Sequence, residues 1–411
     1  MAQFNITLSQ EEILQLLSTD REGAFKELLK ASLDSILLAE SEEQIQAERY
    51  ERSEDRMDSR NGFRDRDLTT RLGSITLHVP RHRNVPFETM IFDNYTRSEG
   101  ALITTMAEMC VDGISTRKVS RVMETLCDQS YSKSTVSNVC KKLDASVTEF
   151  KNRPLEAEYP FVIVDGTYFK VRENHRIISK ALLIALGINS EGMKEVIGFG
   201  TYKNESNETW ETFFDDLKKR GLHGVKMITS DAHEGIVNAI AKVFPSVPWQ
   251  RCQYHFTANI VEAAPVRYQI GLRTELREMF NSKTIEDARK RRDEILNDYM
   301  DVAEKAMECL DRGFESAMTV MTIPEVIRRP FRTSNYLERL NRELKKRSNV
   351  IGIFPNEDSI IRLMGSVLIE RHEHFQGMQK LFYHTDINRL HLVTDALEKI
   401  AQEQHLLIQA A

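Results

Sequence analysis

The sequence predicts a mixed α/β protein whose core is a five-stranded sheet with helices, interrupted by an all-helical insertion. Three strand-like segments follow one another and then alternate with helices, an order typical of a mixed sheet. Residues 260–322 have a helical, highly charged pattern without a strand signal. The segments before the sheet are mainly helical. We therefore expect a core in two parts, preceded by a separate N-terminal region.

The composition is that of an ordinary globular protein. Of 411 residues, 41% are hydrophobic and 29% charged, and the net charge is -6. This length indicates two or three domains, and the acidity excludes a polybasic protein. Nucleic-acid binding stays open, because it depends on local clusters of Lys and Arg. No apolar stretch approaches the roughly 20 residues of a membrane helix, no signal segment opens the chain, and the odd, widely spaced cysteines argue against disulfides. We expect a cytoplasmic protein.

The N-terminal region divides into two segments. Residues 1–58 form a helical, acidic lead-in, which we expect to pack or self-associate, with a helical contact to DNA as the alternative. Residues 59–100 are rich in arginine and contain an expected strand at 75–79, with Gly62 and Gly73 as turn residues. The arginines that could contact phosphates are Arg60, Arg64, Arg81 and Arg83.

Residues 101–150 predict short helices over 101–112, 116–126 and 133–143. Ser115 and Ser132 are expected N-caps, since a hydroxyl there accepts from a free amide of the first turn. Such helices, joined by tight turns, suit a helix-turn-helix, although a structural bundle with a solvated face is the alternative. The candidate DNA contacts are Arg117, Lys118, Lys133, Ser134, Asn138, Lys141 and Lys142.

The core is expected in residues 158–258 and 329–411, on either side of the insertion at 259–328. Strands are predicted over 161–171, 177–188, 195–202, 225–230 and 249–254, and helices over 209–220 and 235–244. A final helical run begins near Ser334 and is broken at 352–355.

Two aspartates stand at positions where chemistry is plausible. Asp165 lies inside the first core strand, where a carboxylate is costly to bury. Asp231 ends the fourth strand. Each alone could cap a turn, but adjacent strands of one sheet could bring both to a common edge. Two such groups can hold hard divalent cations about 4 Å apart, the arrangement used in phosphodiester chemistry.

A third carboxylate is available on the helix that follows Ser334. Leu337, Leu340 and Leu344 form an apolar stripe, and beside it Glu338, Asn341, Arg342 and Lys345 share one face. Glu343 faces another way. This face would place an acid next to groups that grip a DNA backbone. The alternative is a surface ion pair between Glu338 and Arg342.

Cys252 and His255 offer a thiol and an imidazole on or beside the fifth strand. Their spacing invites a zinc interpretation, but no second pair nearby completes a tetrahedral site. We expect them to orient the strand or to assist the active site through hydrogen bonds. The absence of a phosphate-cradling glycine loop and of a G-x-S-x-G elbow gives no support to nucleotide hydrolysis or serine-esterase chemistry.

At these residues the sequence closely resembles the Mutator-type transposases of bacterial insertion sequences. The matching stretches, in the family's order, are 60–64, 77–83, 113–119, 164–167, 229–235, 251–255, 333–347 and 353–356. The resemblance implies an RNase H-like core with an Asp-Asp-Glu triad interrupted by a helical insertion. Asp165, Asp231 and Glu338 match the triad, and Cys252 and His255 match the family's Cys-x-x-His motif.

The resemblance implies a DNA transposase that binds terminal inverted repeats, cleaves the strand and joins it to target DNA. Two Mg²⁺ ions, with Mn²⁺ as a substitute, would be held by the triad. The expected partners are double-stranded DNA and further copies of the chain, with neither a membrane nor a small-molecule substrate, in the bacterial nucleoid. The alternatives are a DNA-binding regulator without catalysis and a metal-dependent nuclease that cuts but does not join.

Overall fold

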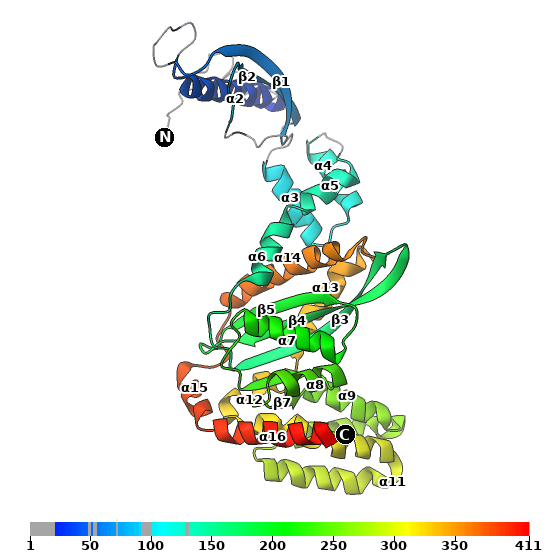
Figure 1. Ribbon diagram of the computed structural model, residues 1–411. Coiled ribbons are helices and arrows are strands. Elements are labelled where there is room, and N and C mark those ends of the chain that lie inside the picture. Colours follow the sequence, from blue (N-terminus) through cyan, green and yellow to red (C-terminus); the bar gives the residue numbers. More distant parts are fainter. Residues whose placement is uncertain are drawn as a thin grey trace. The chain divides into compact units, whose positions relative to one another are not determined.

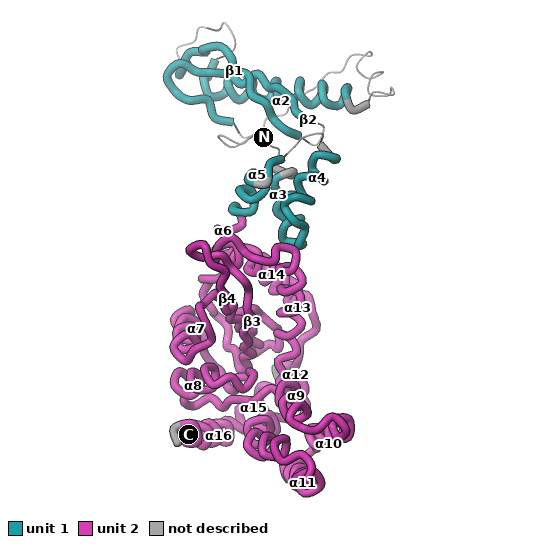
Figure 2. Tube along the Cα trace, turned by 90° about the vertical axis from the view of Figure 1, so that its right-hand side faces the viewer, with its two compact units in different colours: residues 1–142 teal, residues 143–411 magenta. Residues whose placement is uncertain are grey.

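The computed structural model describes residues 21–47, 51, 56–70, 73–89, 91, 100–127 and 131–410. Part of the expected lead-in at 1–58 lies outside these residues, as does the side chain of Lys133. The chain forms two compact units, Met1–Lys142 and Leu143–Ala411 (Figure 2). Among the described helices, none combines the length and apolar character that crossing a bilayer requires.

The first unit begins with a helix packed on a β-hairpin. Helix α2 (Arg21–Ile45) contacts strand β2 (Gly73–His82), which pairs antiparallel with β1 (Arg60–Thr70). The strand expected at 75–79 is therefore present, but the arginine-rich stretch before it is also a strand. Gly62 was predicted to be a turn residue and instead lies inside β1, at a bulge where its φ is +75°. The buried core of this part is Leu37, Leu68, Ile75, Leu77 and Val79.

Three short helices complete the first unit: α3 (Gly100–Val111), α4 (Thr116–Cys127) and α5 (Lys133–Cys140). The hydroxyls of Ser115 and Ser132 accept hydrogen bonds from amides three residues on, at 3.4 and 3.0 Å, so both predicted N-caps are confirmed. The predicted helix over 133–143 extends three residues too far, since α5 ends at Cys140. The amide of Lys142 donates to the carbonyl of Val139, and this tighter turn ends α5 before Lys141.

The second unit is built on the predicted five-stranded mixed sheet, with strand order β5-β4-β3-β6-β7. Strands β3 (Phe161–Glu173), β4 (Arg176–Ile188) and β5 (Lys194–Tyr202) form an antiparallel meander. Strands β6 (Met227–Ser230) and β7 (Trp249–Arg251) continue the sheet in parallel to β3. The predicted fifth strand is shorter than expected, because helix α9 begins at Gln253.

Helices cover both faces of this sheet (Figure 1). On one face, α7 (Asn207–Lys219) and α8 (Glu234–Val243) bury Trp210, Phe213, Phe214 and Ile236 against Val162 and Val164. The other face is contacted by α13 (Asn335–Asn349) and α14 (Glu357–Gln376), and α6 (Leu143–Asn152) packs on α14. Because alternate residues of β3 face opposite sides, Asp165 lies on the α13 side.

The helices between β7 and α13 have a hydrophobic core of their own, which includes Phe256, Leu276, Leu310 and Phe314. Helix α11 has a kink at Ala303. The helices of this insertion and of the C-terminal part are α9 (Gln253–Ala263), η1 (Val266–Tyr268), α10 (Gln269–Phe280), α11 (Ile285–Met318), η2 (Thr319–Thr322), α12 (Glu325–Phe331), α15 (His384–His391) and α16 (Thr394–Ala410).

The sheet depends on the aromatic layer beneath α7. Phe214 is fully buried in this layer, so we expect Phe214→Ala to lower the free energy of unfolding by about 3–5 kcal/mol through lost burial and a cavity. The measurement is the urea midpoint followed by far-ultraviolet circular dichroism. Val326→Ala is the matched control, because Val326 is 68% exposed. Equal midpoints for the two variants would contradict this packing.

Candidate active site

Asp165 lies inside β3, next to the point where Asp231 directly follows the neighbouring parallel strand β6. In the β3–β6 register, Ile163 is opposite Thr229. Asp165 comes two residues after Ile163, and Asp231 comes two residues after Thr229. The Asp165 carboxylate accepts hydrogen bonds from the Gly166 amide at 2.9 Å and from Asn341 Nδ2 at 2.8 Å. The Asp231 carboxylate accepts one from the His233 amide at 3.2 Å. The sheet therefore brings the two predicted carboxylates to one edge.

Burial makes the charge on Asp165 costly. Desolvation, and then repulsion by Asp231, raise the pKa of Asp165 to about 7, against the opposing hydrogen bond from Gly166. The nearby His255 also favours the ionised form. A group with this pKa beside a second carboxylate is typical of a site that is completed by a cation.

Helix α13 carries the third predicted carboxylate to the same region. Its predicted apolar stripe, Leu337, Leu340 and Leu344, is buried, and α13 packs against β3. Asn341, one turn after Glu338, is also buried and donates to Asp165. In the described part of the chain, Glu338 interacts with Ser334 and His255 and forms no ion pair with Arg342. The surface-pair alternative for Glu338 is therefore not what the structure contains.

Cys252, His255 and Ser334 surround Glu338. The amide of Ser334 donates to Cys252 Sγ at 3.4 Å, and its hydroxyl lies 3.2 Å from both Cys252 Sγ and Glu338 Oε1. His255 Nε2 lies 3.9 Å from Glu338 Oε1. The sequence predicted Cys252 within the fifth strand and His255 directly after it, but β7 ends at Arg251. Cys252 precedes α9 as its N-cap residue and His255 is in the first turn.

This cluster favours a positively charged imidazole. The adjacent Cys252 sulfur raises the pKa of His255 to about 9 despite partial burial, and Glu338 and Asp165 add to the effect. Burial opposes ionisation of Cys252, but interactions with His255 and Ser334 outweigh it and lower the pKa of the thiol. One potential ligand atom from each of Cys252, His255 and Glu338 lies within 4.8 Å of the others. The cation of His255 thus stands between the sulfur and the predicted catalytic carboxylates.

The structure places a fourth carboxylate here that the sequence did not indicate. Glu205, 9% exposed, precedes the N-cap of α7. A Cβ at Gly166 would lie 2.5 Å from the Glu205 carboxyl group, so a larger residue there would displace this carboxylate. Burial raises the pKa of Glu205, with a further contribution from Asp231. The glycine directly after Asp165 was the available signal, because a close approach often requires glycine.

The remaining predicted groups on α13 lie at its surface. Arg342 and Lys345 are exposed, as a backbone-gripping face requires. Glu343 points elsewhere, as expected, and pairs with Arg371 and, at 3.8 Å, with Arg347.

The predicted DNA contacts of the first unit are mostly free to meet a ligand. Arg60 is engaged internally, since it donates to the Ala47 carbonyl at 2.8 Å and lies 3.6 Å from Glu42. Ser134 is exposed, but its hydroxyl joins the N-cap of α5 through Ser132, at 2.7 Å. The other exposed members are Arg64, Arg81, Arg83, Arg117, Lys118, Asn138, Lys141 and Lys142. Of these, Lys141 and Lys142 follow α5 rather than lying on it.

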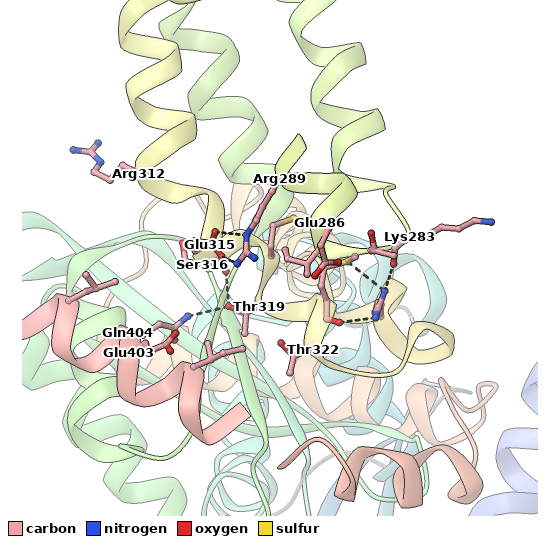
Figure 3. A pocket seen from close by; sticks show the side chains of 17 residues that line it. Lys283, Glu286, Arg289, Arg312, Glu315, Ser316, Thr319, Thr322, Glu403 and Gln404 are labelled. Atoms are coloured by element: carbon pink, nitrogen blue, oxygen red, sulfur yellow. Dashed lines mark hydrogen bonds and ion pairs between the residues drawn. The ribbon is translucent and has the colours of Figure 1, made fainter. Parts of the chain in front are cut away.

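A separate pocket of about 700 Å³ lies between α11, η2 and α16 (Figure 3). Its lining includes none of the predicted site residues. Arg289 pairs with Glu315 at 3.0 Å across it, and Gln404 donates to Thr319 at 3.1 Å. Two charged groups of this pocket, Arg289 and Glu315, thus neutralise each other.

The pKa of Asp165 gives a prediction about stability. Because the raised pKa means that Asp165 keeps a proton in the folded protein that it has lost in the unfolded chain, the contribution of Asp165 to stability should fall as pH rises from about 4 to 7. Asp165→Asn removes this cost, so without metal it should stabilise the protein at pH 8 by up to about 4 kcal/mol and much less at pH 4. Thermal midpoints at both pH values test this, with exposed Asp215→Asn as control. A destabilised Asp165→Asn at pH 8 would contradict it.

Comparison with known proteins identifies the family. The model of the family "Transposase, Mutator family" matches residues 1–378. The transposase of IS256 in transposon Tn4001 from Staphylococcus aureus is 41% identical over 377 residues, 91% of this chain and 96% of the relative. The IS1081 transposase of Mycobacterium tuberculosis is 35% identical over 396 residues, 95% of each chain. That of ISRM5 from Rhizobium meliloti is 34% identical over 362 residues, 88% of this chain and 91% of the relative. The chain therefore belongs to the Mutator family of transposases.

Proposed function

We propose that this transposase binds the terminal inverted repeats of an insertion sequence, hydrolyses a phosphodiester to free a 3′ hydroxyl, and joins that end to target DNA. The observation that carries the proposal is the position of Asp165 and Asp231 at one sheet edge, with α13 bringing Glu338 and Asn341 against it. The names of the relatives, as transposases of insertion sequence elements, support the same activity.

The donor atoms suit a hard divalent cation. Asp165, Asp231 and Glu338 offer carboxylate oxygens, the ligands that Mg²⁺ prefers. Burial, and then repulsion by Asp231, raise the pKa of Asp165, and a bound cation would offset both. These three residues would hold two Mg²⁺ ions, or Mn²⁺ in their place. When bound, the ions would activate the attacking water or hydroxyl and stabilise the leaving oxygen.

The other groups of the site have positioning roles in this proposal. Asn341 holds the Asp165 carboxylate by donating to Oδ2, which leaves Oδ1 with the Gly166 amide. Ser334 and His255 fix Glu338. Arg342 and Lys345, exposed on α13, would contact the phosphates of the bound strand.

The topology supports an RNase H-like core. Three antiparallel strands are followed by two parallel ones, in the order β5-β4-β3-β6-β7, and the helical segment α9 to α12 is inserted before the helix that carries Glu338. In this proposal the first unit binds the element's end, through the exposed cations near β1, β2 and α5. Cutting and joining two ends in one complex requires a dimer or larger assembly.

The triad predicts a joint loss of cutting and joining. Asp165→Asn and Glu338→Gln should each reduce strand cleavage and transfer of a labelled inverted-repeat duplex into a plasmid by about 100-fold or more, because each removes a metal ligand. DNA binding should persist. The matched control is Glu343→Gln, on the same helix but paired with Arg371, which should retain activity.

Three results of that assay would contradict the proposal. Transfer by Asp165→Asn in Mg²⁺ would refute the triad. An end that is bound but never nicked, even in Mn²⁺, would favour the regulator. An end that is nicked but never joined would favour the nuclease.

End recognition gives a separate prediction. Lys141→Glu with Lys142→Glu should weaken binding to the inverted repeat and reduce the slope of log K against log salt by about 2 or more, because each lost phosphate contact removes about 0.9. Fluorescence anisotropy at several salt concentrations measures this. Lys219→Glu, at the end of α7, is the control for net charge. Unchanged binding in the double variant would show that another surface of the protein recognises the inverted repeat.

A further inference from the structure

A groove of about 610 Å³ lies between the insertion and the start of α13. We call it the basic groove. Arg273 and Arg277 come from α10, Tyr254 from α9, Arg329 and Arg332 from α12 and its end, and Asn335 begins α13. None of the described residues that line it is acidic. The groove therefore gathers four guanidinium groups without a compensating carboxylate.

The arginines of the basic groove differ from other arginines of the insertion. On α11, Arg289, Arg291 and Arg292 are paired with acidic side chains. Within the described part of the chain, Arg273, Arg277 and Arg329 are exposed and form no ion pair. Uncompensated positive charge in a concave site attracts anions strongly.

Arg332 forms the inner wall of the groove. Its Nη1 donates to Asn281 at 3.0 Å, whereas its buried Nε has no hydrogen-bond partner in the described structure. Burial, and then Arg328 and Arg329, lower the pKa of Arg332. A buried donor that is left unpaired costs free energy, and a bound anion near it would relieve both this cost and the repulsion.

The basic groove adjoins residues of the candidate active site on α9 and α13. Tyr254 directly precedes His255, and the two ring centroids are 5.6 Å apart. The amide of Gln253 donates to the Arg332 carbonyl at 2.9 Å, which joins α9 to α12. Asn335 lies one turn before Glu338 on α13. DNA held in the groove would therefore lie close to His255 and to the helix that carries Glu338.

Tyr254 indicates which form of nucleic acid fits. Its ring is 56% exposed beside the unpaired arginines, and the combination of a cationic groove with an exposed aromatic ring is that of single-strand binding surfaces. In a duplex the base faces are covered by their neighbours, so a side chain from the groove could not stack on them.

We propose that the basic groove binds a single-stranded stretch of DNA next to the phosphodiester that is cut, with its arginines on phosphates and Tyr254 stacked on an unpaired base. This inference rests on the proposed function for the identity of the ligand. Beyond the proposed function, the inference specifies which segment of the DNA the groove holds. It also specifies that this segment is single-stranded where the strand is cut.

The test is photocrosslinking of the full chain to oligo-dT that carries 5-iodo-2′-deoxyuridine, in EDTA. The tryptic peptide 252–267 contains Tyr254 as its only tyrosine, so mass spectrometry locates the crosslink. We expect it at Tyr254, and we expect its yield to fall at least about 10-fold in the Arg273→Gln, Arg277→Gln double variant. Arg289→Gln, paired with Glu315 outside the groove, should keep the wild-type yield.

A second readout is the salt dependence of oligo-dT binding. The double variant should have a slope shallower by about 1.4, since each phosphate contact to a single strand contributes about 0.7, and Tyr254→Ala should weaken binding about 5- to 150-fold. A crosslink that avoids peptide 252–267, or one that is unchanged in the double variant, would overturn the proposal. Because both assays exclude metal, a chain that crosslinks at Tyr254 but never cuts DNA would refute the catalytic proposal and leave the groove intact.

Discussion

The organisation of the second unit depends on holding two like charges at one sheet edge. Asp165 lies inside β3 and Asp231 directly follows the parallel strand β6 at matched register, and burial together with their repulsion makes ionisation of Asp165 costly. Such an arrangement persists only if the surrounding fold fixes it. Here the apolar strands and the aromatic layer under α7 fix the edge, while the Gly166 amide, Asn341 and the His255 cation offset part of the charge.

The helical insertion lies between β7 and α13, and its contacts position α13 next to the two aspartates. The insertion has its own core, so it does not compete with the sheet for apolar side chains. Its start is tied to the sheet, because the Cys252 amide donates to the Ser230 carbonyl, and its two ends are joined, because the Gln253 amide donates to the Arg332 carbonyl. Its end is also tied to the sheet, because the Thr229 hydroxyl donates to the Phe331 carbonyl. Ser334 then joins Cys252 to Glu338. The positions of Glu338 and of the basic groove are thus two consequences of one set of contacts.

Much of the second unit could be predicted from local pattern, since the strands alternate and α13 has a regular apolar stripe. The two candidate catalytic aspartates could be predicted for the same reason, because each is an acid inside or directly after an apolar strand. Other features arise only in three dimensions. Glu205 is an ordinary acid before a helix until Gly166 lets it approach, and the groove arginines come from separate helices. The true ends of β7 and α5 depend on the N-cap at Cys252 and on one tightened turn, which periodicity does not reveal.

In the proposed function, Asp165, Asp231 and Glu338 share bound divalent cations. Iron-dependent cleavage tests this sharing: Fe²⁺ replaces Mg²⁺ in the full chain, ascorbate and peroxide are added, and the positions where radicals formed at the metal cleave the polypeptide are mapped. We expect three cleavage clusters, near residues 165, 231 and 338, that all disappear when excess Mg²⁺ is added. Cleavage near only one of these segments, or cleavage that Mg²⁺ does not suppress, would contradict a shared metal site.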